Sequence, residues 1–145
     1  MYDLQALIGS QLETHARAFK EARVVPIGHG LQLVPLTDKL WSELGGGVPF
    51  DWFERRSEIV EHWANEISST APVAYVEAEF FGGVGSQSAV AWSDGSRVLG
   101  PIHAEDSINQ ALRFLGVRSD GVHDEFDAVN LGRHRTTKRW RASAR

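Results

Sequence analysis

The sequence predicts an α+β fold: a single domain with a mostly antiparallel sheet and helices packed on one face of it. Residues 72–101 contain three consecutive strand-like segments, joined by a Gly-rich loop and by the tight turn Asp94-Gly95, as in a meander. Elsewhere, hairpin patterns outnumber the strand–helix–strand units of a parallel sheet. The 145 residues suffice for one core. We expect the meander Val73–Gly100 to be central in the sheet.

The first 71 residues predict a strand, two β-type runs and three helices. Capping signatures mark the helix starts, with Ser10 and Glu13, and then Asp51 and Glu54, as capping boxes and Thr37 as a single cap. Apolar residues recur at strand or helix spacing after these signatures. The expected bounds are 2–8 for the strand, 23–27 and 31–36 for the β-type runs, and 11–22, 38–44 and 52–68 for the helices.

The first meander strand, Val73–Phe81, alternates between two faces. Its even-numbered positions predict the face on the core, and its odd-numbered positions place Glu77 and Glu79 beside Tyr75 on a face open to water. The next segment, Gly82–Gly85, has the glycines of a phosphate loop but lacks the Lys-Ser/Thr pair and opens no helix. It therefore favours a hairpin turn that needs positive φ.

After the meander, Ser107 and Gln110 form a third capping pattern before a helix that ends near Gly116. The chain then becomes polar and irregular, anchored by a few apolar side chains: Phe126, Val129, Leu131 and Trp140. We expect one domain over 1–132 and a basic C-terminal tail over 133–145. The tail could be flexible, could fold back on the domain, or could bind nucleic acid.

Charge is distributed unevenly along the chain. The net charge is −4, but residues 1–127 hold all 19 acidic side chains and nine basic ones, which gives −10. The last 18 residues hold six basic side chains and no acidic one. An acidic body repels nucleic-acid phosphate and attracts a cationic partner, so a protein partner is expected in preference to nucleic acid.

Two polar groupings could carry chemistry. Glu77 and Glu79 have the spacing of carboxylates that share acid and base roles or ligate a metal. His123, with His134 and the intervening carboxylates, could form a metal site, although the spacing matches no ligand motif. No nucleophile–base arrangement accompanies either group, so the sequence predicts no catalytic residue, no metal and no cofactor, and a binding protein is favoured over an enzyme.

Three features that the sequence lacks indicate the cellular compartment of the protein. The chain has no cysteine, no N-terminal signal-peptide pattern, and no apolar run approaching the roughly 20 residues that span a membrane. We therefore expect a cytoplasmic protein without a membrane partner.

Three segments carry a resemblance to known proteins: AYVEAEFFGGVGSQSAVAW, INQALRFLGV and DEFDAVNLGRHR. Together, over about residues 30–140, the chain resembles small uncharacterised bacterial proteins, some of which are immunity proteins of toxin–immunity pairs. The resemblance implies a role in toxin neutralisation, and it assigns no functional residue.

The expected function is that of a small acidic binding protein, and its expected specific form is an immunity protein that neutralises a cationic toxin domain by protein–protein contact. The expected contact residues are Tyr75, Glu77, Glu79, Trp52, Asp124, Glu125 and Asp127. Two alternatives stay open: a small hydrolase or metal-dependent enzyme with an acidic/His site, and a structural or homo-oligomeric domain that pairs through an edge strand such as 31–34.

Overall fold

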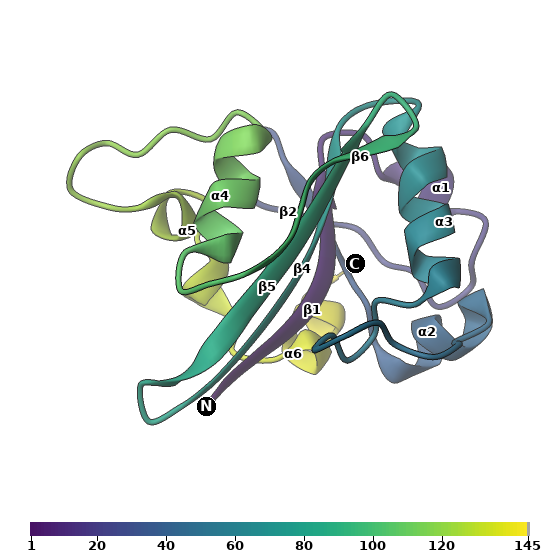
Figure 1. Ribbon diagram of the computed structural model, residues 1–145, viewed down its shortest axis with the longest axis horizontal. Coiled ribbons are helices and arrows are strands. Elements are labelled where there is room, and N and C mark those ends of the chain that lie inside the picture. The colour runs from purple at the N-terminus through teal and green to yellow at the C-terminus, as the bar shows by residue number, and fades with distance from the viewer. Residues whose placement is uncertain (145) are drawn as a thin grey trace.

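One six-stranded antiparallel sheet runs through the middle of the molecule in the computed structural model, which describes residues 1–144 (Figure 1). The strands lie in the order β2-β3-β1-β4-β5-β6. Their bounds are Tyr2–Gly9 for β1, Val25–Pro26 for β2, Gln32–Pro35 for β3, Val73–Phe81 for β4, Val84–Ser93 for β5 and Ser96–His103 for β6. The predicted α+β class is confirmed, with the meander β4–β6 forming one half of the sheet.

Helices cover both faces of the sheet, so the expectation that they pack on one face is wrong. Helices α1, α2 and α3 lie on one side, and α4 and α5 on the other (Figure 1). The helix bounds are Glu13–Ala16 for α1, Asp38–Leu44 for α2, Glu58–Ser68 for α3, Ser107–Phe114 for α4, Glu125–Ala128 for α5, Leu131–Arg133 for the 3-10 helix η1 and Thr137–Ser143 for α6.

The start of β4 explains the two-sided packing. Val73 and Tyr75 point into the core under α3, whereas Ala74 and Val76 point into the core under α4, and all four are buried. A strand buried on both faces needs a helix layer on each. The predicted alternation of side chains along β4 is therefore correct, but both of its faces are covered at this end.

Two-residue turns close both hairpins of the meander. Phe81 pairs with Val84 across Gly82-Gly83, and Ser93 pairs with Ser96 across Asp94-Gly95. All four turn residues have positive φ, which is the requirement of a type I′ hairpin turn. The Gly-rich segment is thus a turn, as predicted.

Two predicted helices are shorter than their patterns indicate. The helix expected over 11–22 is helical at Glu13–Ala16, and the helix expected over 52–68 begins at Glu58 with Ser57 as its cap. Asp51 has a φ of 48° and does not cap it. The backbone N–H groups of the missing turns bind distant carboxylates instead: Glu43 accepts from residues 20 and 21, and Glu77 from residues 54 and 55.

The basic C-terminal segment is folded onto the sheet edge in the described residues. Strand β3 pairs with residues 6–9 of β1. Residues 135–137 lie along the same edge of β1 at its first residues, where Thr136 forms a bridge with Asp3. The backbone N–H of Asp3 donates to the carbonyl of Arg135 at 2.8 Å. Helix α6 follows, and its Trp140 is 1% exposed in the core on the α4 side.

No helix formed by residues 1–144 has the length and apolar character needed to cross a membrane.

Candidate functional site

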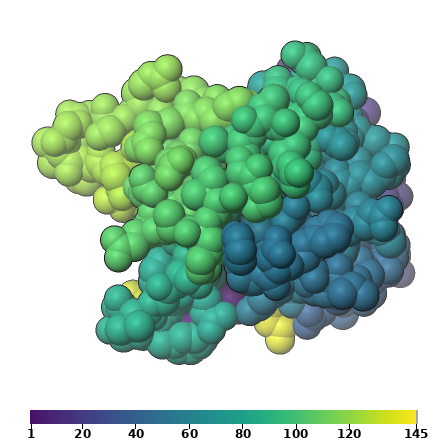
Figure 2. All heavy atoms as spheres, viewed as in Figure 1, coloured from purple at the N-terminus to yellow at the C-terminus, as the bar shows by residue number. Residues whose placement is uncertain are grey.

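The face of the sheet beyond α3 is polar, and a loop covers it in place of a helix. Residues directly opposite on neighbouring strands share a face, so the register of β1, β4 and β5 places two polar rows there. The rows are Gln5–Glu77–Ser88 and Asp3–Glu79–Ser86. Figure 2 shows a hollow at this place, between the teal tip of the β4–β5 hairpin and the blue loop 45–57. We call it the sheet hollow.

Glu77 fixes the loop to the sheet. Its carboxylate accepts hydrogen bonds from the backbone N–H of Glu54 at 2.7 Å and of Arg55 at 2.8 Å, and from the hydroxyl of Tyr75 at 2.5 Å. The side chain is 7% exposed. Burial raises the pKa of Glu77, and the three hydrogen bonds oppose that shift. Burial and the neighbouring Glu77 also raise the pKa of Tyr75 well above its ordinary value.

Arg56 holds the other end of the loop. Its guanidinium is buried, lies 4.9 Å from the ring centroids of both Phe50 and Phe53, and contacts the Glu61 carboxylate at 3.2 Å. Two of its nitrogens have no hydrogen-bond partner among the described residues, so the aromatic faces supply the electrostatic contact there. Loop 45–57 is therefore anchored at two points, which leaves Trp52 and Glu54 over the sheet hollow.

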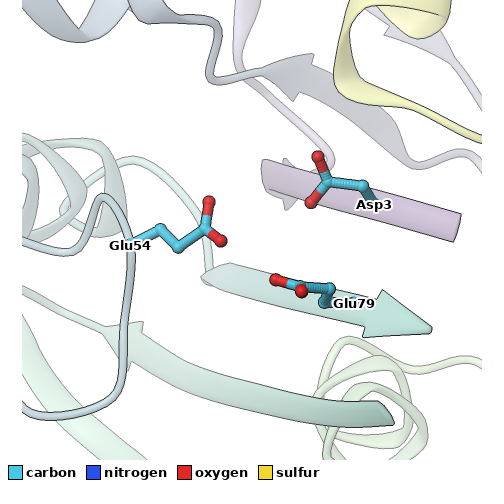
Figure 3. A group of neighbouring side chains, drawn as sticks. All are labelled: Asp3, Glu54 and Glu79. Carbon is cyan, nitrogen blue, oxygen red and sulfur yellow. The ribbon is translucent and has the colours of Figure 1, made fainter. Parts of the chain in front are cut away.

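Three carboxylates converge in the sheet hollow (Figure 3). Asp3 comes from β1, Glu79 from β4 and Glu54 from the loop, and one oxygen of each lies within 4.8 Å of the others. None of the three forms an ion pair with a residue in the described part of the chain. We call these three residues the acid cluster.

The acid cluster changes the protonation of Glu54. Partial desolvation, a hydrogen bond to Glu79 and the charges of Asp3, Glu77 and Glu79 raise the pKa of Glu54 to about 7, although its side chain keeps contact with solvent. At neutral pH, Glu54 is thus protonated in part of the molecules. Its carboxyl can exchange that proton with a ligand, or release it when a cation arrives.

The acid cluster is also the group that could hold a metal. Within residues 1–144 it is the one set of three potential ligands close enough to surround an ion. Its all-oxygen donors suit Mg²⁺, Ca²⁺ or Mn²⁺. The histidines predicted as metal candidates lie elsewhere: His123 contacts Asp120 at 3.2 Å, and His134 packs edge-on against Trp140.

Exposed aromatic side chains flank the acid cluster. Trp52 is 50% exposed, and its ring lies 4.9 Å from that of His103 at the end of β6. Phe81, 55% exposed, lies on the same face of β4 as Glu79, next to the hairpin turn. The sheet hollow therefore combines unpaired negative charge with apolar surface on two sides.

The predicted contact residues divide into two groups. Trp52, Glu77 and Glu79 line the sheet hollow, but Glu77 is only 7% exposed and its carboxylate is bound to loop 45–57. Tyr75 is fully buried and offers no surface to a partner. The remaining three lie at α5, on the opposite side of the sheet (Figure 1). Of these, Asp124 caps α5, Glu125 is buried in an ion pair with Arg113 at 3.1 Å, and Asp127 is exposed.

Sequence reasoning missed Asp3 and Glu54. The alternation of Asp3 and Gln5 with apolar residues in β1 signals one polar face, and the register with β4 brings that face beside Glu79. Glu54 carried the pattern of a helix start, and no local signal places it in a loop over the sheet.

Comparison with known proteins finds no matching family model, no matching curated protein and no matching solved structure.

Proposed function

We propose that this protein is a small acidic binding protein whose sheet hollow receives a cationic side chain of a partner protein. The observation that carries the proposal is the acid cluster of Asp3, Glu54 and Glu79, which forms no ion pair with a basic side chain in residues 1–144 and opens to solvent. An arginine or lysine from a partner would supply the missing positive charge, and bidentate pairing with carboxylates favours arginine.

The surroundings of the acid cluster support a protein partner. Trp52 and Phe81 are exposed aromatic residues, and aromatic anchors beside a charged contact are typical of binding hot spots. Loop 45–57 also exposes Val48, which is 82% exposed, and Phe50, which is 37% exposed. Glu77 and Arg56 anchor this loop, so its aromatic side chains are already ordered before a partner binds. This preorganisation reduces the entropy lost on association.

The charge of the whole chain supports a cationic partner. Residues 1–127 carry −10, and a field of this sign accelerates encounter with a positively charged domain. A cationic toxin domain is a partner of this kind, so an immunity role is the specific form that we propose.

The test is binding to the product of the gene next to the one that encodes this protein, measured by calorimetry. Charge reversal with Glu54→Lys and Glu79→Lys is expected to weaken binding about 100-fold or more. The matched control is Glu13→Lys with Glu58→Lys, because both residues are exposed, form no described ion pair and give the same change in net charge. Equal affinity of the two double variants would contradict the proposal, and no binding by the wild type would contradict the immunity role.

A second candidate function is an enzyme that uses Glu54 and Glu79 as an acid–base pair, with or without a divalent ion. The pKa of about 7 for Glu54 favours it, because a general acid or base works best when its pKa lies near the ambient pH. Calorimetric titration with MgCl₂, CaCl₂ and MnCl₂ tests whether the acid cluster binds a divalent ion. A heat of binding that is present in the wild type and lost in Glu54→Gln would support an ion-dependent enzyme. The absence of any heat of binding in the wild type would exclude a resident divalent ion.

A further inference from the structure

A second concave surface lies between α2 and α6, beside the first residues of β1. Its volume is about 850 Å³, within the range of small-molecule sites. Met1 and the β1 residues Asp3 and Gln5 line it on one side, residues 37–39 form one wall, and residues 136–138 with 141 and 142 form the other. We call it the α2–α6 cleft. It touches the sheet hollow at Gln5, which lines both.

A buried hydrogen-bond network makes the β1 side of the α2–α6 cleft rigid. The side-chain oxygen of Gln5 accepts from Arg55 at 2.6 Å and from the Thr137 hydroxyl at 3.0 Å. The Gln5 amide nitrogen donates to Asp3 at 2.8 Å, and Arg55 pairs with Asp38. Gln5 and Thr137 are 2% and 5% exposed. Such a network holds this side in one arrangement before any ligand arrives.

The positive and negative side chains of the cleft that lack an ion-pair partner among residues 1–144 lie in different parts of it. Arg55 and Arg141 are paired with Asp38 and Glu21, respectively. Lys39 on the α2 wall and Lys138 on the α6 wall form no ion pair with any residue from 1 to 144. Asp3, on the β1 side, belongs to the acid cluster. A ligand in the cleft therefore meets the ammonium groups of Lys39 and Lys138 on the walls and the carboxylate of Asp3 on β1.

We propose that the α2–α6 cleft binds a small zwitterion of the free amino-acid type. Its carboxylate lies between Lys39 and Lys138, and its ammonium or guanidinium group faces Asp3 at the end of the acid cluster. A ligand with one charge leaves one of these two sets unpaired, so the zwitterion is favoured over a simple anion or cation. This site shares Asp3 with the partner contact proposed above, but it differs from that contact in Lys39 and Lys138, which lie outside the sheet hollow.

The probe is L-arginine, titrated into the ¹⁵N-labelled full chain and followed by amide chemical shifts. We expect shifts concentrated at Gln5, Lys39, Thr137 and Lys138. Agmatine, which lacks the carboxylate, should bind about tenfold more weakly, a loss of about 1.4 kcal/mol. An absence of localised shifts at millimolar L-arginine, or equal binding of agmatine, would overturn the proposal.

Variants separate this site from the partner contact. Lys39→Glu with Lys138→Glu should abolish the L-arginine shifts, whereas Lys20→Glu, an exposed lysine outside the cleft, should leave them unchanged. Binding of the partner protein should survive the Lys39/Lys138 change. L-arginine shifts that persist in that double variant would show that the lysines do not hold the carboxylate and would refute the site.

Discussion

Glu77 and Glu79 lie two residues apart on one face of β4, yet their surroundings differ. Glu77 is buried and accepts three hydrogen bonds that fix loop 45–57 to the sheet. Glu79 is partly exposed and faces Asp3 and Glu54. The first carboxylate therefore stabilises the fold, and the second is available to a ligand.

Replacement of these two residues should separate the roles. Glu77→Gln should lower the free energy of unfolding by about 2–3 kcal/mol, because the amide that replaces one carboxylate oxygen cannot accept a hydrogen bond. Glu79→Gln should change it by less than about 0.5 kcal/mol, because the buried hydrogen bonds of Glu77 to the loop backbone stay in place. Urea denaturation of the two variants measures the difference, and equal losses would contradict the anchoring role of Glu77.

Glu54 makes stability depend on pH. Its pKa rises from 4.5 to about 7 on folding, so between these values the folded chain holds a proton that the unfolded chain releases. The free energy of unfolding should therefore fall as pH increases from 4.5 to about 7. Glu54→Gln should make this decline shallower. Part of the decline should remain in that variant, because the pKa of Glu77 is also raised in the folded chain. Urea denaturation across this range measures the slope, and an unchanged slope in Glu54→Gln would contradict the raised pKa.

At the scale of elements, carboxylates from distant residues decide where helices begin and end. Glu43 binds the N–H groups of Lys20 and Glu21, and Glu77 binds those of Glu54 and Arg55. The N–H groups of Lys20, Glu21 and Arg55 are therefore not available to helix carbonyls, so α1 stays short and α3 begins late. Because the acceptor is remote in sequence, no local pattern could predict either boundary.

Other elements follow directly from local pattern. The alternation in β4 and the turn residues Gly82-Gly83 and Asp94-Gly95 predict the meander, and the structure has it at these residues. The acid cluster was predictable only in part: Glu79 stands out on its strand, whereas Asp3 requires the register of β1 with β4. Glu54 depends on the loop that Glu77 creates, which is a tertiary effect.

Helix α6 should contribute strongly to stability although it lies in the basic C-terminal segment. Trp140→Ala should lower the free energy of unfolding by about 3–5 kcal/mol, because a fully buried indole leaves a large cavity. Arg139→Ala, at an exposed neighbouring position, should have little effect and serves as the control. Thermal and urea unfolding measure both. A Trp140→Ala protein as stable as the control would contradict the docking of α6.

At the scale of the whole molecule, the two-sided helix packing leaves one part of the sheet open. Helix α3 covers the apolar end of the face, and the polar end with the acid cluster is reached from solvent beside loop 45–57 (Figure 2). The acidic residues at α5 lie on the opposite side and do not extend this surface. Charge and exposed aromatic side chains therefore coincide at the sheet hollow.

The association rate with a cationic partner, measured against ionic strength, tests the central claim most directly. For the wild type with the product of the adjacent gene, the rate should fall steeply with added salt, because screening weakens the attraction. Glu54→Lys with Glu79→Lys should associate slowly and with little salt dependence, while Glu13→Lys with Glu58→Lys should keep most of the wild-type rate and slope. Equal loss in both double variants would show that net charge, and not the sheet hollow, attracts the partner.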